Sequence, residues 1–283
     1  MPTLPIRNAF SIDVEDYFQV SALAPHFPRH IWDQQPCRVE RNVDRMLALL
    51  SDNRTQATFF TLGWVAERYP EMTKRIVAEG HELASHGYGH QRVSDLDRAG
   101  FFEDITRAKK LLEDLGGQAV IGYRAPSFSI GEKNLWALDT LGEAGYQYSS
   151  SIYPIRHDHY GMPNAPRFAF RPDTAKSFIE LPATTIRFFD RNLPAAGGGY
   201  FRLLPYQISR WSIRRVNAKD QQPCIFYCHP WEIDPEQPRP TGMALKTRFR
   251  HYVNLGRMEP RLRSLLKDFR WGRVDDVFFG SAN

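Results

Sequence analysis

Two histidines lie four residues apart in the stretch SHGYGH, as His86 and His90. The two glycines between them argue against a regular helix and allow a sharply folded loop. The preceding GHELAS predicts a short strand, so the pair would lie on the loop that leaves it, where α/β folds gather active-site groups. With one carboxylate, two imidazoles form a zinc site that keeps an open coordination position. A pair of hydrogen-bonded loop histidines is the structural alternative.

Three carboxylates end an apolar run in FSIDVEDYF, at Asp13, Glu15 and Asp16. Like charges this close repel one another, so without a cation at least one is pushed toward protonation. A bound metal ion removes that penalty. Solvated side chains at a strand end are the alternative, and this stretch alone does not decide between the two.

Two further strand ends carry residues that could take part in catalysis. IGYRAPSFS offers Arg124, a fixed positive charge that can orient a carboxylate and keep it ionised, followed by Pro126, which sets the turn. IFYCHPWEID offers His229 after an apolar strand, with Trp231 beside it. Either residue alone is as readily structural.

Strands and helices alternate along the chain. Buried strands are predicted by the apolar runs at 9–14, 57–62, 119–123, 178–183 and 224–229, and amphipathic helices by the patterns at 39–50, 64–79 and 101–115. This alternation predicts a mainly parallel α/β sheet or barrel. From 153 to about 202 the rhythm gives way to a Pro-, Gly- and Arg-rich stretch, which we expect to form substrate-side loops.

Composition is that of an ordinary globular protein, with 283 residues, 42% hydrophobic residues and a net charge of +5. The positive excess is concentrated late, because residues 245–273 hold nine Lys and Arg against Glu259 and Asp268. A solvated helix face is its plain explanation, and no nucleic-acid recognition module accompanies it. We expect Cys37, Cys224 and Cys228 to be buried thiols. The N-terminus lacks a secretory signal, which predicts a cytoplasmic protein.

In order, SIDVED, SHGYGH, GYRAPSFS and FYCHPWE resemble the successive motifs of the NodB-type polysaccharide deacetylases, carbohydrate esterase family 4. The resemblance implies a distorted (β/α) barrel of that type, in a single domain. We expect it to span residues 1–240, with a basic helical extension packed on it at 241–283. More narrowly, DVEDYFQV, GGGYFRLLPY and HYVNLGRMEPRLRSLL resemble the subfamily found with exosortase/PEP-CTERM exopolysaccharide systems.

The family resemblance also implies roles. Asp13 would be the general base, Arg124 its orienting partner and His229 the acid that protonates the leaving amine, while His86 and His90 would bind a divalent metal, most simply Zn²⁺. The substrate contacts expected from the sequence are Tyr88, Pro126, Trp231 and Tyr200, and His157 and His159 could also reach substrate.

Two departures from the family pattern are visible. Much of the family has adjacent aspartates, the second being a metal ligand, whereas here Val14 follows Asp13. Strand alternation puts Glu15 on the face of Asp13, but if the strand ends there Asp16 can turn inward instead, and we favour Asp16 slightly. YSSSIYP resembles the family's Asp-Ser-Ser motif with Tyr148 in place of the acid.

The expected activity is therefore metal-dependent removal of acetyl groups from N-acetylated sugars of a polysaccharide or its precursor, through water held by the metal. Two alternatives stay open: hydrolysis of a small or cyclic non-sugar amide on the same fold, and non-catalytic carbohydrate binding in an exopolysaccharide assembly. The expected partner is an N-acetylated glycan, without nucleic acid. A membrane-bound partner could bring the protein to the inner membrane surface.

Overall fold

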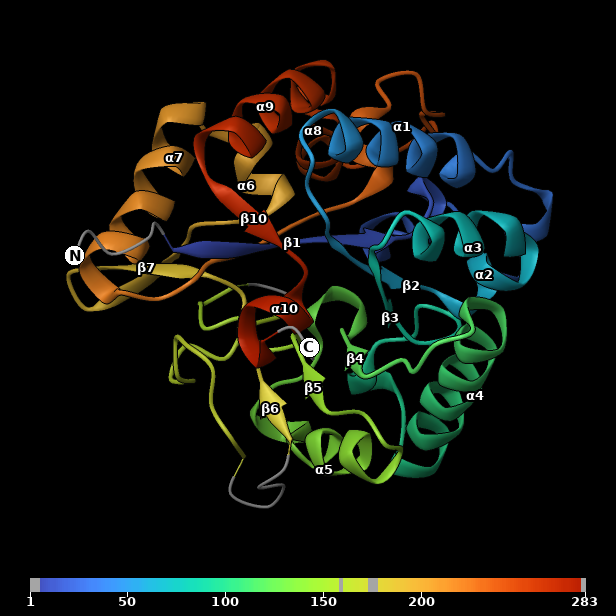
Figure 1. Cartoon of the computed structure of the whole chain (residues 1–283). Coiled ribbons are helices and arrows are strands. Elements are labelled where there is room, and N and C mark those ends of the chain that lie inside the picture. The colour runs from blue at the N-terminus through green and yellow to red at the C-terminus, as the bar shows by residue number, and fades with distance from the viewer. Residues whose placement is uncertain (1–5, 158–159, 173–177, 281–283) are drawn as a thin grey trace.

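The parallel sheet is the centre of the molecule (Figure 1). The structure, a computed structural model, describes residues 6–157, 160–172 and 178–280. The strands are β1 (Arg7–Val14), β2 (Thr58–Thr61), β3 (Glu82–Ser85), β4 (Gly122–Tyr123), β5 (Tyr148–Ser149), β6 (Ile179–Glu180), β7 (Thr185–Phe188), β8 (Arg191–Pro194), β9 (Ile225–Cys228) and β10 (Arg270–Gly272). All but β7 and β8 join this sheet.

Helices cover the outside of the sheet. They are α1 (Val39–Asp52), α2 (Gly63–Arg68), α3 (Pro70–Ala78), α4 (Arg98–Gly116), α5 (Trp136–Glu143), α6 (Gly198–Leu203), α7 (Tyr206–Arg215), α8 (Leu245–Tyr252), α9 (Leu255–Asp268) and α10 (Val274–Phe279). A π-helical turn, η7 (Val216–Asp220), extends α7, and short 3₁₀ turns include η1 (Tyr17–Gln19), η3 (Arg29–Gln34), η5 (Pro126–Phe128) and η8 (Pro230–Ile233).

The sheet runs in the order β10-β1-β2-β3-β4-β5-β6, and β9 also pairs with β1. Every pairing in it is parallel, so the strands all end at the same edge. The sheet curls into an open half-barrel with helices around it (Figure 1). The predicted α/β fold, a distorted barrel in a single domain with C-terminal helices, is confirmed.

Burial explains why the central strands read as continuous apolar runs. Side chains of β1 from Asn8 onward are buried on both faces, since helices cover one side and the curled sheet the other. The main core lies between β1, β9 and the layer of α1 and α9, where Phe10 packs against Phe226 and Trp271. Cys224 and Cys228 are buried free thiols, as predicted, and Cys37 is half-buried.

Three elements differ from the prediction. The single helix expected at 64–79 is two helices, because Tyr69 leaves helical geometry and Pro70 starts α3. The stretch expected as loops contains the antiparallel β7–β8 hairpin and α6. The C-terminal region supplies a strand as well as helices, since β10 pairs with β1. A domain division at residue 240 stays a prediction.

No helix within 6–157, 160–172 or 178–280 is both long and apolar enough to cross a bilayer.

Candidate active site

The carboxyl ends of β1, β3, β4 and β9 deliver the chemically active side chains to one cleft. Its cavity of about 370 Å³ is lined by Asp13, Glu15, His86, His90, His229 and Trp231, among others. Parallel strands that end at one edge bring these residues together although they lie as many as 218 positions apart in the chain, from Asp13 to Trp231. As expected from the sequence, the residues that follow these strands lie close together.

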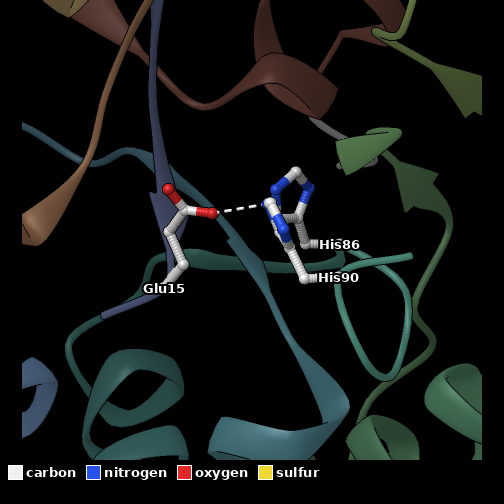
Figure 2. Close-up of side chains that lie close together, drawn as sticks. All are labelled: Glu15, His86 and His90. Atoms are coloured by element: carbon white, nitrogen blue, oxygen red, sulfur yellow. Dashed lines mark ion pairs between the residues drawn. The ribbon is translucent and has the colours of Figure 1, made fainter. Parts of the chain in front are cut away.

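Glu15, His86 and His90 form the tightest group in the cleft (Figure 2). One ligand atom from each residue lies within 4.8 Å of the other two, and His90 Nε2 is 2.6 Å from Glu15 Oε2. The Nδ1–H of His86 donates to the Arg124 carbonyl at 2.8 Å, which leaves its Nε2 free to coordinate. Two imidazoles and a carboxylate in this arrangement fit a divalent cation.

Electrostatics favour the protonation states that a cation requires. Burial raises the pKa of Glu15, but the His90 and His229 imidazoles outweigh it and hold that pKa well below its ordinary value. Burial also lowers the pKa of His86 to about 4, although Asp13 opposes the shift. The group therefore offers an ionised carboxylate beside a neutral imidazole.

Asp16, which the sequence favoured slightly over Glu15, does not join this group. Its carboxylate accepts N–H bonds from Tyr17 at 2.8 Å, Arg38 at 2.5 Å and Val39 at 2.9 Å, so it caps η1 and the first turn of α1. The strand ends at Val14, and strand alternation still carries Glu15 to the side of Asp13. The geometry therefore places Glu15, and not Asp16, with the two histidines, and the identity of the carboxylate ligand stays a prediction.

Asp13 is held by Arg124 in a buried ion pair. The Nη1 of Arg124 is 2.5 Å from Asp13 Oδ1 and also donates to Ser11 Oγ at 2.9 Å. The rest of the guanidinium donates to the backbone and hydroxyl oxygens of Ser150. Arg124 thus orients Asp13 with its side chain and His86 with its carbonyl.

His229 also lies near Asp13, with its Nε2 3.8 Å from Asp13 Oδ2. Its Nδ1 is 3.2 Å from Glu232 Oε2, and Glu232 also pairs with the buried Arg202 at 2.8 Å. Burial lowers the pKa of His229, but the Glu15, Glu232 and Asp13 carboxylates outweigh it and raise this pKa to about 9. Glu232 therefore orients an imidazolium.

Sequence reasoning missed Glu232 and Arg202. Glu232 was within reach, because it stands three residues after His229 in the quoted FYCHPWE. Arg202 carried no local signal, since it lies in α6 and is fixed by the carbonyls of His251 and Val253 from the end of α8.

An aromatic stack forms one wall of the cleft. His229 stacks on Trp231 with ring centroids 5.1 Å apart, and Trp231 stacks on His251 at 4.4 Å. The indole Nε1–H donates to Glu15 Oε1 at 3.1 Å, so Trp231 also orients the carboxylate of the Glu15–His86–His90 group.

The 86–90 loop is supported from α4. Asp104 accepts N–H bonds from Tyr88 at 2.9 Å and Gly89 at 3.4 Å. A Cβ at Gly89 would meet the Arg29 guanidinium at 1.6 Å, and Gly87 has a φ of +76°. The backbone conformation at position 87 therefore favours glycine, whereas a Cβ at position 89 would require the exposed Arg29 side chain to move.

Of the four predicted substrate contacts, only Trp231 lines the cleft. Tyr88 turns away from it, donates to Glu67 and stacks under Arg107. Pro126 is buried at the start of η5, where Ser127 and Phe128 face the cleft instead. Tyr200 lies in α6 outside the lining residues. His157 lines the cleft, and His159 lies outside the described residues.

Residues 31–149 match the family model described as "Polysaccharide deacetylase". This region belongs to the polysaccharide deacetylase family. Residues 150–279 match a model described as "Domain of unknown function (DUF3473)". The NodB-type resemblance is thus confirmed at the level of the family, and the boundary between the two matches falls just after β5 (Tyr148–Ser149).

Curated relatives match the chain in part. A chitin deacetylase from Pestalotiopsis sp is 35% identical over 118 residues, which cover 40% of this chain and 39% of the relative. A peptidoglycan-N-acetylglucosamine deacetylase from Bacillus cereus is 33% identical over 96 residues, 34% of this chain and 35% of the relative. The chain therefore matches little more than a third of the length of these deacetylases.

Solved structures match over nearly the whole chain. A protein from Mycobacterium smegmatis described as a polysaccharide deacetylase aligns with a TM-score of 0.61 and 20% identity, covering 96% of this chain and 91% of its own. An allantoinase aligns with a TM-score of 0.60 and 16% identity, covering 98% and 90%. These likenesses establish the fold, which proteins of different activity share.

Proposed function

We propose that this protein is a metal-dependent hydrolase that removes acetyl groups from N-acetylated sugars. The observation that carries the proposal is the meeting of three devices in one cleft: the Glu15–His86–His90 group, the Asp13–Arg124 pair and the His229–Glu232 pair. Hydrolysis of an amide needs a Lewis acid or oxyanion site, a base and an acid, and each has a candidate here.

Glu15, His86 and His90 would hold the cation, and we propose Zn²⁺ because the ligand set is nitrogen-rich with one carboxylate. When bound, the cation would polarise the acetyl carbonyl and make a nearby water more acidic. The second ring nitrogen of His86 is already engaged by Arg124, and the Glu15 carboxylate is engaged by Trp231. Such outer contacts fix ligand orientation and raise affinity.

Asp13 would take the proton from the attacking water. Arg124 keeps one carboxylate oxygen of Asp13 engaged, so the other, Oδ2, is turned toward His229 and the cleft. A base oriented by a buried guanidinium loses little freedom in the reaction, which lowers the entropic cost of the proton transfer.

His229 would donate its Nε2 proton to the departing sugar nitrogen. The three carboxylates around it favour the imidazolium needed for that step, and Glu232 fixes the ring through Nδ1. A cation bound by Glu15 would offset part of that carboxylate's effect and bring the His229 pKa closer to neutrality, where a general acid works best.

An N-acetylated glycan is the proposed substrate. The cleft is lined by the aromatic rings of Phe128, Tyr160 and Tyr227, which suit sugar rings. The names of the two relatives, a chitin deacetylase and a peptidoglycan-N-acetylglucosamine deacetylase, refer to such glycans. We extend the proposal to an exopolysaccharide or its precursor and to the exosortase/PEP-CTERM subfamily. This extension is supported by the resemblance of GGGYFRLLPY and HYVNLGRMEPRLRSLL.

The test compares four proteins: wild type, His86→Ala, His229→Ala and the exposed-site control His30→Ala. Metal content and acetate release from N-acetylated chitooligosaccharides are measured on each. We expect one metal ion and acetate release in wild type and control, loss of both in His86→Ala, and retained metal with turnover lowered roughly 10²- to 10⁴-fold in His229→Ala.

Full activity in either active-site variant would contradict the assigned roles. Absence of metal from the wild type would contradict the cation site. Bound metal without acetate release would turn the search to an unusual or lipid-linked sugar, or to a small cyclic amide. Cleavage of such an amide would replace the glycan proposal while leaving the site intact.

A further inference from the structure

The outer face of α7 and its π-helical extension combines exposed apolar side chains with arginine and lysine. Ile208 is 43% exposed and Trp211 47% exposed. Arg214 is exposed beside them and Lys219 follows in η7, while Arg215 reaches over the Trp211 ring at 5.6 Å. Ile208, Trp211 and Arg215 are three, four and seven positions apart and so share one side of α7, while Arg214 borders them one turn after Trp211 and Lys219 follows in η7. These five residues are named here the α7 face.

The cations of the α7 face are available to an external partner. Arg210, on the same helix, pairs with Asp268 of α9, and Asp220 pairs with Arg167. By contrast, no carboxylate in the described parts of the chain forms an ion pair with Arg214, Arg215 or Lys219. From Tyr206 to Lys219 the sequence contains four basic residues and no acidic one.

Neighbouring elements extend this charge. The Arg210–Asp268 pair and the Tyr206–Asp268 hydrogen bond join α7 to α9, which belongs to the basic stretch 245–273. Leu203, at the end of α6, adds another exposed apolar side chain next to the start of α7. Figure 1 shows α6, α7 and α9 in one part of the helical layer outside the sheet, far from α4.

We propose that the α7 face docks the protein on an anionic lipid surface. Arginine and lysine attract acidic headgroups, and each basic residue near such a surface contributes about 1 kcal/mol, or roughly fivefold in affinity. Tryptophan and isoleucine between those cations match the boundary between headgroups and acyl chains. A soluble polyanion would satisfy the cations but would offer the two apolar side chains nothing to enter.

The test is sedimentation of the full chain with vesicles of phosphatidylcholine alone or with 30% phosphatidylglycerol, as ~30% acidic lipid gives a strong surface potential. Three proteins carry the argument: wild type, Ile208→Ser/Trp211→Ser, and Arg214→Gln/Lys219→Gln. Matched controls on α4 are Phe102→Ser, which is 41% exposed, and Lys110→Gln. Melting temperatures of all variants exclude unfolding as a cause.

We expect wild type and both controls to bind the acidic vesicles only, with affinity falling as salt rises. Each double variant should lose about tenfold or more in affinity. Trp211→Phe should keep most of the binding, because an aromatic ring is retained. Variants at this face should leave the metal content unchanged, since the α7 face is separate from the cleft.

Three outcomes would overturn the proposal. One is no binding to acidic vesicles at low salt. Another is binding that survives both α7 variants but disappears in Phe188→Ser/Phe189→Ser, which would place the contact on the exposed tip of the β7–β8 hairpin. The third is equal binding to soluble dextran sulfate without any effect of Ile208→Ser/Trp211→Ser, which would identify a polyanion site.

Discussion

At the scale of the residue, Asp13, His86 and His229 are each oriented by a hydrogen bond or ion pair with a neighbouring residue. Arg124 orients Asp13 through its guanidinium and His86 through its carbonyl, so one residue couples the candidate base to the candidate cation site. Glu232 orients the His229 ring through Nδ1. Lysine could not replace Arg124, because the fork that reaches Asp13, Ser11 and Ser150 together requires a planar guanidinium.

Asp104 is expected to set cation affinity without touching the cation. Asp104→Asn replaces one acceptor oxygen by an NH₂ group beside the Tyr88 and Gly89 N–H groups, so the 86–90 loop loses a support. We expect the dissociation constant for Zn²⁺ to rise about 10- to 100-fold. Competition with a zinc-binding dye measures it.

Asp114→Asn is the matched control, because Asp114 lies exposed on the same helix and pairs only with the neighbouring Lys110 among the contacts described. An unchanged zinc affinity in Asp104→Asn would show that the histidine loop holds its shape without α4.

At the scale of the element, α6 is packed against the turn that follows β9. A Cβ at Gly198 would lie 1.9 Å from Glu232 Oε2, whereas a Cβ at Gly199 would meet nothing within 4 Å. Glu232 cannot give way easily, since it is buried and paired with Arg202, which itself donates to the His251 and Val253 carbonyls at the end of α8. The short helix therefore determines where the partner of His229 can lie.

Gly198→Ala should displace Glu232 and disturb His229. Overpacking of this kind costs about 1–3 kcal/mol of stability. We expect a lower melting temperature and a lower kcat with unchanged metal content. Gly199→Ala should be neutral or stabilise by up to ~1 kcal/mol, because alanine is the better helix former. Thermal unfolding and acetate release on both variants check the pair, and equal behaviour of the two would refute the steric argument.

At the scale of the whole molecule, the C-terminal region closes the end of the half-barrel opposite the cleft. β10 pairs with β1, and the first N–H groups of α10 donate to Thr58 and Glu82. Glu82 is buried there, accepts from Thr58 and Tyr148 as well, and so links β2, β3, β5 and α10. Tyr148, which stands where the family motif that it resembles has an acid, donates to Glu82 at this end of the sheet.

The raised pKa of Glu82 predicts that the free energy of unfolding falls as pH rises. Burial and the nearby Asp275 raise its pKa to about 8, from an ordinary value of 4.5. Between those values the folded chain keeps a proton that the unfolded chain has lost. Its contribution is therefore complete below about pH 4.5 and is lost as pH rises through 8, by at most about 1.4 kcal/mol per pH unit.

Glu82→Gln, which resembles the protonated acid, should remove this dependence. Urea unfolding from pH 5 to 9 should show the wild type losing stability relative to Glu82→Gln as pH rises. A difference that stays constant over that range would mean that Glu82 is already ionised in the folded protein.

The sequence by itself determined the alternating strands and helices, because their apolar periodicity is local. It also placed Asp13, His86 and His229 at strand ends, which a parallel sheet brings to one edge. Local signals could not decide between Glu15 and Asp16. The N–H groups of Arg38 and Val39, more than twenty residues away, engage Asp16 and hold it apart from the two histidines. Nor could local signals reveal the Arg202–Glu232 pair, which joins α6 to the turn after β9, or the strand β10, which forms only when the C-terminal region packs on β1. Apolar periodicity is a local property of the sequence, whereas contacts between residues distant in sequence form only when the elements pack together.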